Sequence, residues 1–294
     1  MSPETVRLLR RLARHKGVLV GTAIVLVWVG LALLGSGPLT GFELASFDPA
    51  EGLARRRLPP LGAGPDGRTF LCGTDDLGRD VLGLVLHGAR YSLTIGLCAV
   101  AVSLLLGVPI GLVAGYFGGR LDGLLMRGLD VLMAFPTILL AICVVTALGQ
   151  SLPNLMLAVG IVGVPAVARQ LRAQVLVVRE LEYVQAARAL GFSHTRILAL
   201  HVLPNCLAPV IVLGTLGTAT AILETAGLGF IGLGAEPGTP EWGLLISDNK
   251  NLVTAAPWTV LTPGAAIVLL VLGLNLLGDG LRDVLDPRLA GRTG

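Results

Sequence analysis

Residues 183–205 read YVQAARALGFSHTRILALHVLPN and lie between apolar segments that are long enough to cross a bilayer. Apolar positions recur at helical spacing in the first part of this stretch, at Tyr183, Ala186, Ala187 and Leu190. This spacing predicts a short helix with one narrow apolar face. The stretch also carries two arginines and two histidines, so we expect it at a membrane surface, where its small alanines would let another protein approach closely.

A turn and a second short helix are expected after the first. Gly191 should end the first helix, because a residue without a Cβ adopts the left-handed conformation at little cost. Ser193 is a suitable N-cap for a second helix that runs to Leu200. Pro204 is expected to block a simple continuation of that helix.

The composition of the 294 residues is that of a multi-pass membrane protein. Hydrophobic residues make up 53% of the chain and charged residues only 14%, whereas soluble domains carry about 25% charged residues. The net charge of +3 is too small to indicate a nucleic-acid partner. Four cysteines are present, and their spacing gives neither a disulfide framework nor a metal site.

Uncharged runs predict six transmembrane helices, since a span needs about 20 apolar residues and a helix satisfies its own backbone hydrogen bonds. The first run has 18 residues, longer than the core of a cleavable signal peptide, so we expect it to be retained. The expected helices are 17–34, 91–119, two within 131–168 that are separated by a turn at 149–154, 205–223, and one from about 261 to 278.

Lysine and arginine set the expected orientation. With a cytoplasmic N-terminus, 15 of the 22 basic residues fall on the cytoplasmic side and six on the other. Both termini and the 183–205 loop are therefore predicted to be cytoplasmic. The exception is the triplet at 55–57, which lies in a long outside loop where charge has less influence.

The 183–205 stretch is similar to the cytoplasmic EAA loop of ABC importer permeases, E-A-A-x(3)-G-x(9)-I-x-L-P. Five of its seven positions match, while Gln185 replaces Glu and His201 replaces Ile. In that family the loop docks in a cleft of the ATPase subunit. Gln185 keeps the hydrogen-bonding capacity of Glu without its charge, so an ion pair there is not expected. The alternative is a solvated surface loop. The implied coupling residues are Gln185, Ala186, Ala187, Gly191, His201, Leu203 and Pro204.

The first outside loop carries a second resemblance. Residues 71–82, LCGTDDLGRDVL, look like the segment before the second helix in the C-type permease subunit of dipeptide and oligopeptide importers. Asp75 and Asp76 suit a turn or the start of a helix, and Arg79 and Asp80 suit local capping or pairing. The segment is either a capped surface helix or a contact for a binding protein. The acids lack a recognised metal-ligand spacing.

Two segments nearer the C-terminus resemble the same family. Residues 226–234, AGLGFIGLG, are followed by Trp242 and predict close backbone packing. Trp242 and Trp258 are expected in an interfacial aromatic belt. Glu224 is the one acid in the apolar stretch around the fifth helix and is a candidate pathway residue.

The ending NLLGDGLRDVLDPRL, residues 275–289, also resembles that family and carries the expected cytoplasmic cap on the last helix. We expect this cap to consist of Asp283, Asp286 and Arg288.

These resemblances imply an all-α, polytopic chain with the type I ABC importer permease fold. We expect an N-terminal part at 1–90, a permease core at 91–280 with a coupling loop at about 170–204, and a cytoplasmic tail at 281–294. The chain has no G-x(4)-G-K-[ST] phosphate loop, so it is not its own ATPase. It is expected to bind no cofactor itself, with ATP and Mg on partner subunits.

The implied function is peptide import through the plasma membrane of a bacterium or archaeon. The implied partners are a homologous B-type permease, two ABC ATPase subunits, an extracytoplasmic solute-binding protein and membrane lipid, with no nucleic acid. Three alternatives stay open. The same class of permease also imports nickel and other chelated solutes. An ion-coupled secondary transporter would need midplane charges and an internal repeat. A membrane scaffold would leave the 183–205 loop without an ATPase partner.

Overall fold

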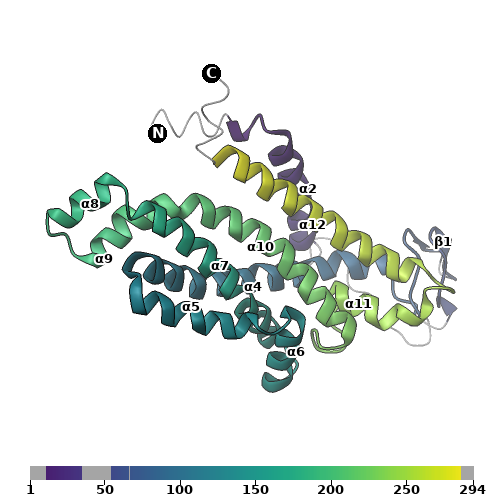
Figure 1. Cartoon of the computed structure of the whole chain (residues 1–294). Coiled ribbons are helices and arrows are strands. Elements are labelled where there is room, and N and C mark those ends of the chain that lie inside the picture. Colours follow the sequence, from purple (N-terminus) through teal and green to yellow (C-terminus); the bar gives the residue numbers. More distant parts are fainter. Residues whose placement is uncertain (1–10, 35–53, 66, 286–294) are drawn as a thin grey trace.

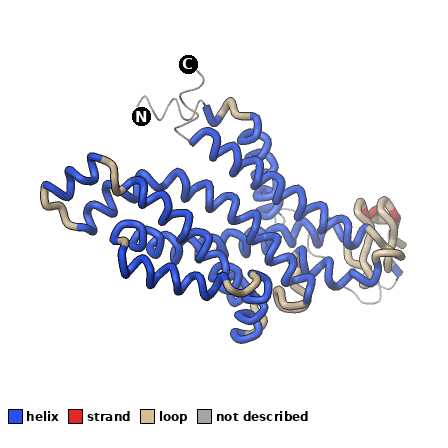
Figure 2. Tube along the Cα trace, viewed as in Figure 1, coloured by secondary structure: helices blue, strands red, loops and turns tan. Residues whose placement is uncertain are grey.

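The computed structural model describes residues 11–34, 54–65 and 67–285. Within these ranges the chain is a bundle of long helices with one two-stranded hairpin (Figures 1 and 2). The long helices are α2 (Lys16–Leu34), α4 (Val81–Phe117), α5 (Gly119–Met133), α6 (Thr137–Leu148), α7 (Leu152–Val178), α10 (Leu203–Ile231) and α12 (Trp258–Leu285). The short elements are β1 (Gly62–Ala63), β2 (Thr69–Phe70), α8 (Glu182–Ala189), α9 (His194–Ile197), a π turn (Leu198–Val202), α11 (Trp242–Asn249) and a 3-10 turn (Lys250–Leu252).

The predicted number of spans agrees with the structure. Five described helices are long and apolar enough to cross a membrane: α2, α4, α7, the continuous helix from α9 to α10, and α12. The α5–α6 pair passes the same test together but is bent by 88°. Pro136 explains this break, because proline lacks an N–H and restricts the residue before it. Counting the bent pair as one gives six.

Several predicted boundaries were wrong. α4 begins at Val81 rather than 91, because the Asp80 side chain caps it by accepting from the Leu82 N–H at 3.0 Å. α7 extends through Val178, well beyond the end of its uncharged run. Helices α10 and α12 likewise exceed the predicted 205–223 and 261–278. A charged side chain can lie on the surface of a helix without ending it. An uncharged run therefore marks only the apolar part of that helix.

The core of the bundle is the close approach of α4 to α7. Small residues recur every four positions on α4, at Ser103, Gly107, Gly111 and Gly115, and all four are buried. A Cβ on Gly111 would lie 2.6 Å from a backbone oxygen of α7. The Ser103 hydroxyl donates to the Gly160 carbonyl of α7 at 2.7 Å. This pattern lets two backbones meet in an apolar bundle.

Charged side chains hold α5 against α7. Arg172 of α7 forms a bidentate pair with Asp122 of α5, with nitrogen–oxygen distances of 2.5 and 2.6 Å. Arg169, about one turn earlier in α7, pairs with Asp130, about two turns later in α5. Each arginine thus has an acidic partner, which lowers the cost of placing these charges on spanning helices.

The two ends of the bundle differ in structure. α8 and α9 lie at one end, and the β1–β2 hairpin and the start of α12 lie at the other (Figure 1). The predicted turn at 149–154 is present but shorter: only residues 149–151 lie between the helices, because Ser151 caps α7 by accepting from the Asn154 N–H. The start of α2 meets the end of α12, where His15 lies 3.5 Å from Asp283. The other two residues of the expected C-terminal cap, Asp286 and Arg288, lie outside the described residues.

Candidate coupling site

The turn between α8 and α9 has the geometry expected from the sequence. Gly191 has φ +78° and follows Leu190, the C-cap of α8. Its N–H donates to the Arg188 carbonyl at 3.0 Å, and the Phe192 N–H donates to the Ala187 carbonyl at 3.1 Å. This is a Schellman motif, and the accompanying hydrophobic contact is present because Ala187 and Phe192 join the same apolar cluster.

The predicted single apolar face of α8 was wrong. Val184 and Ala187 point into the protein and are 0% and 4% exposed, whereas Tyr183, Ala186 and Leu190 are exposed. Both sides of this helix carry apolar residues, so helical spacing alone does not reveal which side meets the core. The outer side presents Leu190, at 74% exposure, beside Ala186.

The second helix of the loop does not end at Leu200. α9 passes through the π turn, where the Leu203 N–H donates to the Leu198 carbonyl, and continues as α10. Pro204 lies in the first turn of α10, where its missing N–H is tolerated. Ser193 has the extended backbone of an N-cap but makes no side-chain capping bond.

The seven predicted coupling residues differ in how far they are exposed to solvent. Gln185, Ala186, Gly191 and Pro204 are exposed, His201 and Leu203 are half-buried, and Ala187 is buried. The amide of Gln185 donates to the Glu180 carbonyl at 3.3 Å and forms no ion pair within the described residues. The His201 ring stacks on Phe192, and its buried Nε2 has no hydrogen-bond partner in the described part of the chain.

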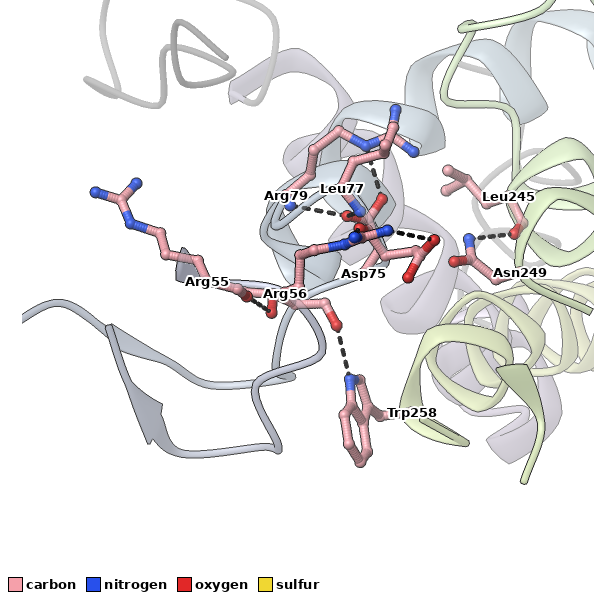
Figure 3. A network of polar contacts seen from close by, with 10 residues as sticks. Arg55, Arg56, Asp75, Leu77, Arg79, Leu245, Asn249 and Trp258 are labelled. Atoms are coloured by element: carbon pink, nitrogen blue, oxygen red, sulfur yellow. Dashed lines mark hydrogen bonds and ion pairs between the residues drawn. The ribbon is translucent and has the colours of Figure 1, made fainter. Parts of the chain in front are cut away.

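At the opposite end, the segment that holds the four predicted loop residues forms a polar cap, and Figure 3 shows Asp75 and Arg79 of this cap in contact. Asp75 is buried and accepts from the backbone of Leu77 and Arg79 and from the Arg79 side chain at 2.7–2.9 Å. Asp76 pairs with Arg57 and Arg56, which lower the pKa of its carboxyl. The segment is thus a turn, and neither acid starts a helix.

Asp80, the fourth of these residues, caps α4. Burial raises the pKa of its carboxyl, and backbone N–H groups of the first turn oppose that shift. Figure 3 also shows Trp258 reaching this cap, where its indole N–H donates to the Thr74 carbonyl at 3.0 Å. The cap therefore joins the start of α4 to the start of α12.

Trp242 does not belong to an interfacial belt, which corrects the prediction. It is 0% exposed, its indole N–H donates to the Val85 carbonyl at 2.9 Å, and its ring meets Trp28 edge to face at 5.0 Å. The glycine-rich run before it packs closely, as predicted. A Cβ on Gly243 would lie 2.4 Å from the Ala226 carbonyl oxygen. This close packing draws α11, and Trp242 with it, into the bundle.

Glu241 is a buried acid that sequence reasoning missed. Its carboxylate accepts from the N–H groups of Gly243 and Leu244, both at 2.8 Å, and so caps α11. Burial raises the pKa of this carboxyl, and these hydrogen bonds oppose the shift. An acid directly before an apolar helical run is an N-cap signal that the sequence did contain. By contrast, Glu224 is half-buried on α10 and has no hydrogen bond or ion pair within the described residues.

Comparisons with known proteins agree with this architecture. Residues 107–291 match the family described as "Binding-protein-dependent transport system inner membrane component". The dipeptide transport system permease protein DppC of Alkalihalophilus pseudofirmus is 45% identical, over 95% of this chain and 88% of its own. The di/tripeptide transport system permease protein DppC of Pseudomonas aeruginosa is 44% identical, over 94% of this chain and 90% of its own.

A solved structure shows the same fold. One chain of the MetNI methionine ABC transporter, in an inward facing conformation, superposes with a TM-score of 0.57. The alignment covers 68% of this chain and 96% of that chain at 19% identity, so it bears on the fold alone. With the family match spanning most of the helical core and relatives above 40% identity over nearly the whole chain, the chain belongs to the inner membrane components of binding-protein-dependent transport systems.

Proposed function

We propose that this chain is the permease subunit of an ATP-driven importer of dipeptides or oligopeptides. The observation that carries the proposal is the α8–α9 loop. It is a small, rigidly turned unit that projects from two spanning helices and presents Ala186 and Leu190 outward. An exposed apolar surface on a rigid loop fits a partner protein. The peptide cargo is inferred from the names of the relatives above.

We assign the loop to the cytoplasmic side, together with both termini. The excess of lysine and arginine on that side supports this orientation. The contact of His15 with Asp283 places the start of α2 beside the end of α12, as expected if both termini share a side. Two ATPase subunits, which carry ATP and Mg, would dock on the loops of this chain and of a homologous B-type permease.

The opposite end, with the polar cap of Asp75, Asp76, Arg79 and Asp80, would face an extracytoplasmic solute-binding protein. The complex would lie in the plasma membrane of a bacterium or archaeon. Transport would proceed by alternating access, with ATP favouring one arrangement of the helices and nucleotide release the other. This requires that each nucleotide state bind one arrangement better than the other. Glu224 is a candidate for the pathway.

The test is a pull-down of the tagged chain from detergent, expressed with its candidate partners. In the test variant, Ala186→Glu and Leu190→Glu place two charges on the outer face of α8 and leave Val184 and Ala187 untouched. A charge buried without a partner in an interface is strongly unfavourable, so we expect at least a tenfold loss of ATPase subunits. The matched control is Leu71→Glu, at a residue that is 60% exposed in the outer loop.

Retention of ATPase by the double variant would refute docking on this face. Absence of ATPase from the wild type would refute the importer itself and favour a secondary transporter or a scaffold. Competition of unlabelled dipeptide and of Ni²⁺ against labelled dipeptide uptake then separates peptide from chelated-metal cargo.

A further inference from the structure

The last turn of α4 touches the coupling loop through the buried Tyr116 and its neighbour Phe117. The Tyr116 side chain is 4% exposed. Its hydroxyl is hydrogen bonded to Nδ1 of His194, the first residue of α9, at 3.0 Å. The two rings meet edge to face, with centroids 5.7 Å apart, and Phe117 contacts the same imidazole. Residues 78 positions apart in the chain are thus joined side chain to side chain.

The same tyrosine also contacts α8. The guanidinium of Arg188 lies 4.7 Å above the Tyr116 ring, within the range of a cation–π interaction. Arg188 and His194 flank the Gly191 turn, one on each side. Tyr116 therefore contacts both short helices of the loop and bridges the turn between them.

The position of Tyr116 in α4 gives this contact its importance. Two residues later Gly118 ends α4, with φ +67°, and α5 begins at once. The Gly115 carbonyl accepts from the Arg179 guanidinium at 2.7 Å, which ties the same turn of α4 to the end of α7. A displacement of the loop at His194 would therefore act on the junction from which the bent α5–α6 span starts.

We propose that Tyr116 is the positioning residue through which movement of the α8–α9 loop is passed to α4 and α5. This inference rests on the proposed function, because it assumes that ATPase subunits move the loop. The Tyr116 hydroxyl fixes the orientation of the His194 ring, and the Tyr116 ring contacts the Arg188 guanidinium. Together they prevent the loop from moving independently of α4.

The test compares Tyr116→Phe with Tyr91→Phe, the same substitution near the other end of α4. Tyr116→Phe keeps the ring, and with it the apolar packing and the Arg188 contact, and removes only the hydroxyl. Tyr91 makes no hydrogen bond within the described residues. His194→Ala and His194→Asn complete the set, since the Asn amide can replace Nδ1 as a partner of the tyrosine hydroxyl.

Two measurements on the reconstituted complex report transmission rather than folding. The first is the number of ATP molecules hydrolysed per labelled dipeptide imported. The second is maleimide labelling of Leu124→Cys, on the exposed side of α5, with and without ATP and vanadate. The native cysteines are replaced for this assay. The second measurement does not depend on the cargo.

We expect Tyr116→Phe and His194→Ala to raise the ATP cost per dipeptide about fivefold, the factor that one net hydrogen bond supplies. Both should reduce the nucleotide-dependent change in labelling to a similar extent. The two changes combined should do no more than either alone, and His194→Asn should retain most of the coupling. ATPase co-purification and the melting temperature should stay at wild-type values, as in Tyr91→Phe.

An unchanged ATP cost in Tyr116→Phe, with ATPase present, would overturn this inference alone. The inference would also be overturned if labelling of Leu124→Cys, with Tyr116 and His194 unchanged, did not respond to nucleotide. Absence of ATPase from the wild-type complex would overturn the proposed function and this inference with it.

Discussion

The turn at Gly191 allows a sharp test, because the strain of its backbone can be separated from steric clashes with its surroundings. The residue sits at φ +78°, a conformation that side chains with a Cβ rarely adopt. A Cβ built there would meet no heavy atom within 4 Å. Any cost of a substitution therefore comes from the backbone and not from a clash.

The magnitudes follow from that separation. A residue other than glycine in the left-handed region costs about 1–2 kcal/mol, least for Asn and most for a β-branched residue. A difference of about 1.4 kcal/mol changes an equilibrium constant tenfold. Gly191→Val should therefore lower the equilibrium constant for the docked geometry of the loop about tenfold or more. Gly191→Ala should lower it less, and Gly191→Asn least.

The assay is uptake of a labelled dipeptide by cells in which each variant is inserted at wild-type levels. ATPase co-purification is measured in parallel. We expect the order Gly, Asn, Ala, Val in both measurements. Uptake by Gly191→Val equal to that of the wild type would refute the argument. Equal damage by Asn and Val would also refute it, since the backbone strain at this position is smaller for Asn than for Val.

Two further predictions concern the segment around α11. Gly243→Ala should lower the melting temperature in detergent, because its Cβ would lie 2.4 Å from the Ala226 carbonyl oxygen, while Gly264→Ala in open space on α12 should not; equal melting of the two variants would contradict this reading. Burial raises the pKa of Glu241 above its ordinary 4.5, so its folded form holds the proton more readily than its unfolded form. The stability from this group is then present below pH 4.5 and is lost as the pH rises through the raised value. Glu241→Gln should flatten that part of the melting profile, and an unchanged slope would show that another group is responsible.

Some of this structure could be predicted because single residues determine it. The left-handed turn follows from a glycine at the end of a helical pattern, and the turn at 149–154 follows from its own capping residues. The bilayer imposes the length and polarity of each span, so the number of spans could be predicted from uncharged runs. These features depend on neighbours in sequence or on the solvent, and both are visible in the sequence.

Other features depend on partners far away in the sequence. Trp242 is amphipathic and suits an interface, and only its packing against Trp28 and Val85 makes it a core residue. Val184 and Ala187 form the inward side of α8 because they pack against residues of other helices. Nothing in the local sequence of Tyr116 indicates that His194 is its partner, because the fold alone brings them together.

The length of α4 has a mechanical consequence. Its 37 residues span about 55 Å at 1.5 Å per residue, against about 30 Å for the hydrocarbon of a bilayer. One unbroken helix therefore extends from the Asp80 cap, near Trp258, to the contact of Tyr116 with His194. Pro109 lies inside this helix and removes one backbone hydrogen bond, yet the helix continues through it. A change in the tilt of α4 at one end would thus also change its angle at the other, where Tyr116 meets His194.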